Sequence, residues 1–252
     1  MQLFQGTTFE DRLFRMKHRS LPYWIFVRIP LWFIAISLGI VLLLKWVPVT
    51  FTPLMVTQSI KYRSDDSFKL KKKWVPLKKI SPEMVKAVIA SEDNRFFTHH
   101  GFDWEEIRKM WKEHNERGKK IRGCSTISQQ TAKNVFTFGS QTGIRKVYEA
   151  WWTFLIENIW GKARIMEVYL NVAETGKGVF GAEAAAREYW SIHAASLSRS
   201  QACAIAASLP SPLKRNPSTG SGYARKRAGD IQALIPKIAY PDWVGEKCAK
   251  KN

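Results

Sequence analysis

The sequence predicts a mainly α-helical protein, with one apolar helix near the N-terminus followed by a helical domain of ordinary size. Residues 25–49 are almost all apolar, and helix-start signals with helical spacing of apolar residues recur from residue 81 onward. Strand-like alternation of apolar and polar residues is scarce. The length of 252 residues is enough for one anchor and one domain with a buried core.

The composition favours anionic partners. Lys and Arg number 40 against 21 Asp and Glu, which gives a formal net charge of +19. This charge suits nucleic acid, a phospholipid surface or a substrate that carries pyrophosphate, and it does not choose among them. The cysteines, Cys124, Cys203 and Cys248, lie far apart without metal-ligand spacing, which predicts neither a disulfide framework nor a zinc site.

We expect residues 24–48 to form a transmembrane helix. The uninterrupted apolar core is a little shorter than the roughly 20 residues needed to span, but Arg28 and Lys45 can snorkel from its ends. A signal peptide is the alternative; it is disfavoured because its apolar region is usually about 7–15 residues. Most nearby cations precede the helix, so the positive-inside rule places residues 1–23 in the cytoplasm and the rest outside.

Beyond the anchor we expect a linker or membrane-proximal segment at 49–74, a domain at 75–240 and a C-terminal tail at 241–252. Ser81-Pro82-Glu83 is a strong helix start. Ser198 and Gln201 form a capping-box pattern, and the helix that they open stops at Pro210. Helical spacing predicts further helices over 104–116, 126–136, 144–160, 162–173 and 181–190.

The first chemically rich string is E-D-N-R-F-F-T-H-H-G at 92–101. A helix starting at Pro82 would place Glu92 at the end of an apolar stripe, where a carboxylate is a candidate general acid or base. The alternative is a helix-end acid paired with Arg95. We expect Phe96 and His99 to fix the following turn.

The second string, residues 123–134, has the composition of an anion cradle. Small residues at a helix start present backbone N–H groups, and Lys133 adds a full charge. Gln129 and Gln130 suit sugar hydroxyl and acetamido groups. Ser125 would open a capping box if an acid or glutamine followed three residues later, but that position is Ser128. Helix capping by Ser125 is therefore expected to explain little of the polar composition of this string. The alternative to an anion cradle is a helix start with ordinary polar residues.

The third and fourth strings are helical. Arg145 and Glu149 are i,i+4 partners, and an exposed pair of this kind contributes only about 0.3–0.5 kcal/mol and implies no function. Two cations, Arg145 and Lys146, beside an acid would also suit a pyrophosphate leaving group and a second carboxylate. Residues 162–171, which include Asn171, lie in the helix predicted over 162–173, and we expect most of this string to be core.

These four strings, in this order, resemble the glycosyltransferase domain of class A penicillin-binding proteins, and more closely the monofunctional peptidoglycan glycosyltransferases. The resemblance covers most of residues 75–235. It implies a lysozyme-like, mainly helical fold in a bacterial inner-membrane protein. It also implies polymerisation of lipid II into glycan strands by inverting transfer, with a β-1,4 bond formed and undecaprenyl pyrophosphate released.

The resemblance implies that Glu92 is the general base, that Lys133, Arg145 and Lys146 neutralise the pyrophosphate, and that Glu149 positions the donor or a divalent ion, Mg²⁺ or Mn²⁺. Lipid II, the growing strand and the membrane are the implied partners, with other cell-wall synthesis proteins as further candidates and nucleic acid excluded. The remaining residues implied to bind substrate are Asp93, Phe96, His99, Ser125, Thr126, Gln129, Gln130, Asn134 and Asn171.

Two positions depart from the family pattern. Cys124 replaces a common glycine or alanine, and Gln141 replaces an arginine, which removes one expected phosphate contact. Ser211-Pro212-Leu213-Lys214 spells S-x-x-K, but no K-T-G string accompanies it, so we expect no transpeptidase activity. The competing hypotheses are a lytic enzyme that uses Glu92 as an acid and an inactive scaffold of wall synthesis.

Overall fold

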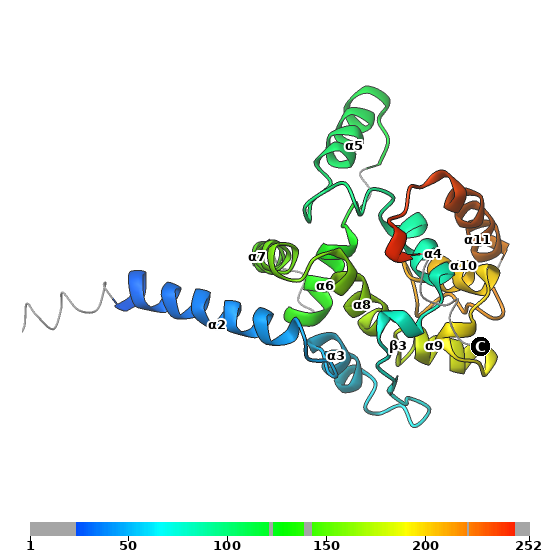
Figure 1. Cartoon of the computed structure of the whole chain (residues 1–252), viewed down its shortest axis with the longest axis horizontal. Helices are drawn as coiled ribbons and strands as arrows, with labels where there is room; N and C mark the ends of the chain where they lie inside the picture. The colour runs from blue at the N-terminus through cyan, green and yellow to red at the C-terminus, as the bar shows by residue number, and fades with distance from the viewer. Residues whose placement is uncertain (1–23, 121–122, 139–142, 221, 245–252) are drawn as a thin grey trace, which may run out of the picture. The chain divides into compact units, whose positions relative to one another are not determined.

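The computed structural model describes residues 24–120, 123–138, 143–220 and 222–244. Helices dominate these residues, and the strands among them are short (Figure 1), which confirms the mainly α prediction. The strands are β1 (Lys71–Lys72), β2 (Glu174–Gly176) and β3 (Val179–Phe180). The α-helices are α2 (Ile29–Leu44), α3 (Pro53–Lys61), α4 (Pro82–Glu92), α5 (Trp104–Arg117), α6 (Ile127–Phe136), α7 (Gly143–Ile159), α8 (Lys162–Val172), α9 (Ala182–Trp190), α10 (Arg199–Ser208) and α11 (Gly222–Leu234).

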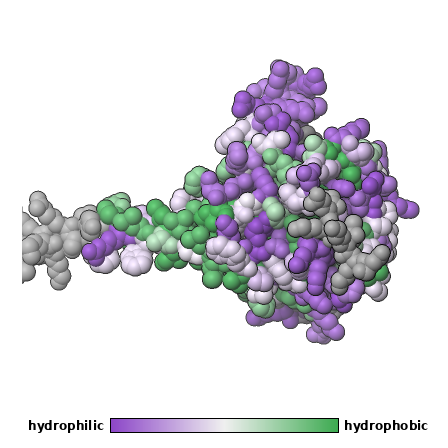
Figure 2. Space-filling model, in the orientation of Figure 1, coloured by the Kyte–Doolittle hydropathy of each residue, from purple (hydrophilic) through white to green (hydrophobic). Residues whose placement is uncertain are grey.

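The chain divides into two compact units, residues 1–43 and residues 44–252. Helix α2 and the π-helical turn before it form a continuous helical stretch of 21 residues, Trp24–Leu44, which is apolar except for Arg28 and Ser37 and has a mean hydropathy of 2.3 (Figure 2). At 1.5 Å per residue this stretch is about 32 Å long, close to the thickness of a bilayer core. It is the single stretch of this kind in the described part of the chain, and it indicates single-pass membrane anchoring. The segment expected in the cytoplasm, residues 1–23, lies outside the described residues.

The segment for which we expected a linker contains regular structure. Thr52 caps the N-terminus of α3 by accepting the N–H of Met55. Strand β1 pairs in parallel with β3, which pairs antiparallel with β2. The β2–β3 turn approaches the chain closely at Gly178, where an added Cβ would lie 2.6 Å from the Lys69 carbonyl oxygen. Residues 71–72 of this segment are therefore joined to the domain by main-chain pairing.

The core of the second unit lies between two groups of helices. Helix α4 packs against α10 and α11, and α6 packs against α7 and α8. The apolar stripe predicted on α4 is buried, with Val85 and Val88 inside. The Phe136 ring of α6 stacks on the Trp152 ring of α7 with centroids 4.2 Å apart. Hydrogen bonds of Glu92 and Asp93 with Gln130 and Ile127 join the C-terminal end of α4 to α6, which carries most of the second string and packs on α7, the helix of the third string.

The structure confirms two of the helix caps predicted from the sequence and corrects the expectation for a third. The Ser81 hydroxyl accepts the N–H of Glu83, and Ser198 with Gln201 forms a capping box, as predicted. Helix α6, however, begins with a capping box between Thr126 and Gln129, one residue after the position that we tested. The expectation that capping explains little of this string is therefore wrong, because Thr126 and Gln129 themselves have the required T-x-x-Q spacing.

Candidate active site

Glu92 is the last residue of α4, and its side chain is only 11 % exposed. Its carboxylate accepts hydrogen bonds from the Ser91 hydroxyl at 3.0 Å and from Nε2 of Gln130 at 3.0 Å. Arg95 instead pairs with Asp103 and Glu105, at 3.3 and 2.5 Å. The reading of Glu92 as a helix-end acid paired with Arg95 is therefore wrong.

Glu92 lines a cavity of about 330 Å³. One part of the wall comes from the first and second strings, including Cys124, Ser125 and Gln130. The remainder comes from the C-terminal part of the domain: Pro210, Arg215, Tyr223 and Arg227. The Arg215 guanidinium lies 4.7 Å from the centroid of the Tyr223 ring. A polar cavity with a carboxylate on one wall and two guanidinium groups on another can hold a hydroxyl-rich, negatively charged ligand.

Sequence reasoning missed Arg227, which is 136 positions from its partner Ser91. Its guanidinium donates to the main-chain oxygen of Ser91 at 3.3 Å and lies 3.9 Å from the Glu92 carboxylate. It thus supplies a positive charge beside the candidate base. The surrounding residues 222–234 belong to no recognisable motif, and the run Arg225-Lys226-Arg227 resembles an ordinary solvated charge run.

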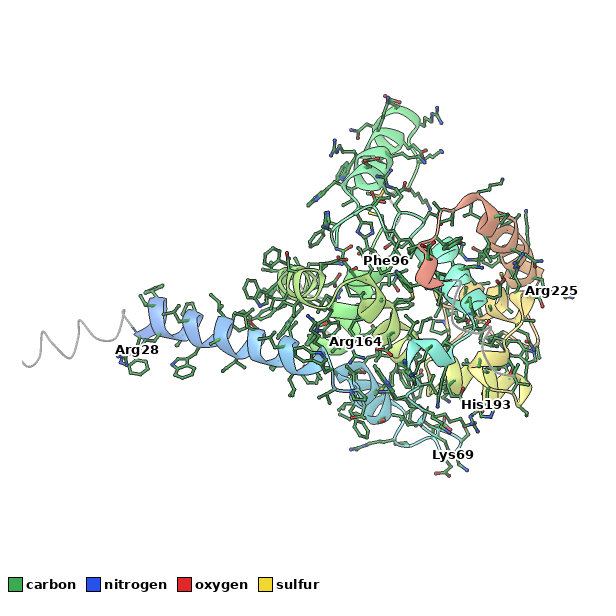
Figure 3. All side chains as sticks on the ribbon, viewed as in Figure 1. Arg28, Lys69, Phe96, Arg164, His193 and Arg225 are labelled. Carbon is green, nitrogen blue, oxygen red and sulfur yellow. The ribbon has the colours of Figure 1, made fainter. Side chains whose placement is uncertain are left out.

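Asp93, Phe96 and His99 lie inside the protein, away from the cavity wall. The Asp93 carboxylate accepts the main-chain N–H of Ile127 and a bond from Nε2 of His99, each at 3.0 Å. Nδ1 of His99 accepts the N–H of Gly101 at 3.1 Å, so the ring proton is on Nε2. Phe96, labelled in Figure 3, is fully buried. These side chains join the turn after α4 to the start of α6.

The polar side chains of the second string have different surroundings. Thr126 and Gln129 cap α6, and the Thr126 hydroxyl also donates to the Gly101 carbonyl at 2.6 Å. Asn134 is buried. Ser125 and Gln130 line the cavity beside Glu92. The cradle predicted over this string is therefore only partly available to a ligand.

Lys133 is close enough to the acids and cations of the site to respond to their charges. Part of its side chain reaches solvent, but desolvation lowers the pKa of its amine below the usual value. Among the charges, Glu149 acts most strongly, and it raises this pKa; Glu92 raises it too, while Arg145 and Lys146 lower it. The Lys133 amine therefore lies within reach of charges from both the first and the third strings.

Glu149 holds two of the predicted cations. Its side chain is 1 % exposed and its oxygens bind Arg145 at 2.9 Å and Lys146 at 2.5 Å. Nζ of Lys146 also lies 3.5 Å from the Ser125 hydroxyl. A buried carboxylate that lost its partners would be strongly destabilising, so this arrangement differs from an exposed helix pair. Gln141, the position of the missing arginine, lies outside the described residues.

The residues present do not fit a resident Mg²⁺ or Mn²⁺ at Glu149. These ions require several oxygen ligands. Both Glu149 oxygens are occupied by cationic side chains. Within the described ranges, no three His, Cys, Asp or Glu side chains gather closely enough to hold an ion.

Asn171 is not part of the cavity. It is 1 % exposed, and its side chain forms a reciprocal pair with Val75: Oδ1 accepts the Val75 N–H and Nδ2 donates to the Val75 oxygen, both at 2.9 Å. Nδ2 also donates to the Glu167 carbonyl at 2.8 Å. Asn171 thus fixes the segment after β1 against α8.

The Glu92 carboxylate shares its cavity with Arg215 and Arg227, and Lys146 approaches the cavity wall at Ser125. Residues 59–234 of the chain match the family described as transglycosylases. The chain belongs to the transglycosylase family. The matched range contains all four strings, which confirms the resemblance stated from them. Together with the helical architecture, the match also confirms the lysozyme-like, mainly α fold class.

This transglycosylase is similar over most of its length to proteins named biosynthetic peptidoglycan transglycosylase. It is 46 % identical to the one from Pseudomonas entomophila (strain L48) over 223 residues, which are 88 % of this chain and 94 % of the relative. It is 47 % identical to the one from Bacteroides thetaiotaomicron over 229 residues, covering 88 % and 92 % of the two chains. For the one from Caulobacter vibrioides the identity is 48 % over 191 residues, with 76 % and 81 % covered.

Proposed function

We propose that this peptidoglycan glycosyltransferase polymerises lipid II, with Glu92 as its general base. The observation that carries the proposal is the placement of Glu92. It lies in a polar cavity at the end of a buried helix, and the Arg227 guanidinium lies 3.9 Å from its carboxylate. A glycosyl transfer that expels pyrophosphate needs both a proton acceptor and positive charge near the leaving group.

In this mechanism Glu92 takes the proton of the 4-hydroxyl on the acceptor's N-acetylglucosamine. The oxygen attacks C1 of the donor's N-acetylmuramic acid as the bond from C1 to the pyrophosphate oxygen breaks. The electron pair of that bond leaves with undecaprenyl pyrophosphate, and the α linkage becomes β. Ser91 and Gln130 hold the carboxylate in place, and Arg227 adds positive charge beside it.

The departing pyrophosphate gains negative charge as its bond breaks. Lys133, Arg145 and Lys146 are the cations proposed to stabilise it. Glu149 contributes by holding Arg145 and Lys146 in a fixed arrangement, since its two oxygens bind one of them each. This role replaces direct binding of a metal or donor by Glu149.

The remaining site residues divide by what their side chains touch. Ser125 and Gln130 line the cavity and are proposed to contact the reacting sugars. The others bind the protein itself or are enclosed by it, so we propose that they position the site without touching substrate: Asp93, Phe96, His99, Thr126, Gln129, Asn134 and Asn171.

A membrane-borne substrate fits a membrane-anchored enzyme. We place the Trp24–Leu44 helix across the bacterial inner membrane, with residues 1–23 in the cytoplasm and the catalytic domain on the outer side. Lipid II, the growing strand and the membrane are then its partners, and other cell-wall synthesis proteins are candidates.

The test is polymerisation of labelled lipid II by the detergent-solubilised full chain, with products resolved by size. The variants are Glu92→Gln and, as a matched control, Glu116→Gln, which removes an exposed carboxylate on α5. We expect long strands from the wild type and the control, and none from Glu92→Gln. Substantial polymer from Glu92→Gln would exclude Glu92 as the base. Shortening of preformed strands by the wild type would instead identify a lytic enzyme. Binding of lipid II by the wild type without any product would identify a scaffold.

A further inference from the structure

We infer that Tyr169 is a positioning residue for the reaction: its hydroxyl fixes the orientation of the Gln130 amide, and this amide in turn holds the Glu92 carboxylate. The inference rests on the proposed role of Glu92 and adds a residue from the fourth string to it. Tyr169 lies on α8, on the face that the sequence assigned to the core.

The contacts form a continuous chain from Tyr169 to Glu92. The Tyr169 hydroxyl donates to Oε1 of Gln130 at 3.2 Å. Nε2 of the same amide donates to Oε2 of Glu92 at 3.0 Å and lies 3.3 Å from the Ser125 carbonyl oxygen. Tyr169 is 39 positions from Gln130, and Gln130 is 38 positions from Glu92.

These surroundings allow only one orientation of the amide. Nε2 faces two acceptors, the Glu92 carboxylate and the Ser125 carbonyl, while Oε1 faces a hydroxyl donor. Turning the amide over would place its oxygen against those two acceptor oxygens, with no proton between them. Without the Tyr169 hydroxyl, Oε1 would lose its donor, and the amide would be held by its two Nε2 contacts alone, so its position against Glu92 would be less well fixed.

Tyr169 is suited to remain a donor throughout the working range of the enzyme. The side chain is 1 % exposed. Burial raises the pKa of its phenol well above the usual value, and the charges of Glu92 and Asp93 raise it further. The ring lines a small apolar space with Met84 and Val88 of α4. A phenylalanine could fill that space equally well, so the hydroxyl is the part of the side chain that packing does not explain.

The inference predicts a separation of kcat from KM. Tyr169→Phe is expected to lower kcat about tenfold, a small share of the roughly 10²–10⁴-fold that a positioned acid or base contributes. KM for lipid II should change less than kcat, because the hydroxyl itself does not touch the ligand and acts on it only through Gln130. The acid limb of the pH–rate profile should move to higher pH, because Glu92 loses a donated hydrogen bond. The other groups that act on or beside Glu92, namely Arg227, Lys133 and Ser91, are unchanged.

The matched control is Tyr189→Phe, which deletes a hydroxyl that donates to the Thr175 carbonyl at 3.1 Å. This control should lose similar stability and keep the wild-type kcat and pH profile. A double-mutant cycle completes the test: adding Tyr169→Phe to Gln130→Ala should cause no further loss of kcat, because the connecting amide is already gone.

The experiment is steady-state polymerisation of lipid II over a pH series by the full chain in detergent, with thermal unfolding of each variant measured alongside. Wild-type kcat in Tyr169→Phe, or a further tenfold loss on the Gln130→Ala background, would overturn the inference. The inference would also be overturned if Tyr169→Phe and Tyr189→Phe lost kcat equally and in proportion to the fall in their melting temperatures. Failure of the wild type to polymerise would instead reject the proposed function.

Discussion

Replacing Asn171 by alanine is expected to destabilise the protein strongly without removing a substrate contact. The substitution takes away the partners of two main-chain groups of Val75, its N–H and its carbonyl oxygen. Each buried polar group left without a partner costs about 1–3 kcal/mol. Because the main chain around Val75 can relax in part, we expect the two groups together to lower the free energy of unfolding by about 3 kcal/mol. For a domain of this size that corresponds to a fall in melting temperature of roughly 6–12 °C.

The assay is thermal unfolding of the full chain in one detergent, followed by circular dichroism, with polymerisation measured well below both melting temperatures. Asn158→Ala is the control, because Asn158 makes a similar bond to the carbonyl four residues earlier, at 2.7 Å, on an exposed face. Its stability should stay within about 0.5 kcal/mol of the wild type.

Asn171→Asp provides a second variant of nearly the same shape. It keeps an acceptor for the Val75 N–H but turns an anionic oxygen toward the carbonyls of Val75 and Glu167, so it should melt at least as early as Asn171→Ala. A wild-type melting temperature combined with loss of polymerisation in Asn171→Ala would refute the reasoning and return Asn171 to the substrate.

Three further outcomes are expected. Glu149→Gln should lower kcat/KM at least about 100-fold, because Arg145 and Lys146 lose the charge that holds them; activity within twofold of wild type would contradict this. Burial raises the pKa of Glu174 above its usual value of 4.5. Between that value and the higher pKa of the folded state, the folded protein binds more protons than the unfolded protein. The free energy of unfolding therefore falls as the pH rises through the pKa of the folded state. Glu174→Gln should therefore melt at a higher temperature than wild type at pH 7, and this difference should shrink as the pH falls below about 4.5; equal differences at the two pH values would contradict it. Thr126→Ala should cost about 2 kcal/mol through the lost cap and the lost bond to Gly101, while Thr126→Ser restores most of it; thermal unfolding measures both.

The helices of the domain were predictable because their ends carry local signals. The stretch predicted over 104–116 is α5 (Trp104–Arg117), and that predicted over 162–173 is α8 (Lys162–Val172). Caps and breaking residues act within a few positions, so the sequence displays them directly. The two-residue strands β1 and β3 carry no comparable signal, since their pairing joins segments more than a hundred residues apart.

The candidate site was predictable in its members but not in their partners. Spacing alone makes Arg145 and Glu149 look like an exposed i,i+4 pair; the packing of α6 on α7 buries the carboxylate, and spacing does not encode that packing. Arg227 reaches Ser91 and Glu92 across 136 and 135 positions, respectively. Contacts over such separations follow from the tertiary fold, which a motif does not describe.

Because Asp93 and Thr126 each bind a residue of the other string, the first and second strings have to be exchanged together when related sequences recombine or are engineered. Asp93 holds the Ile127 N–H from 34 positions away, and Thr126 holds the Gly101 carbonyl from 25 positions away. A chimera that takes one string from a relative with a different turn geometry must break two buried bonds before it changes any chemistry. Exchanging both strings together leaves those bonds intact, so successful recombination should cut the gene outside residues 92–134 and not between the two strings.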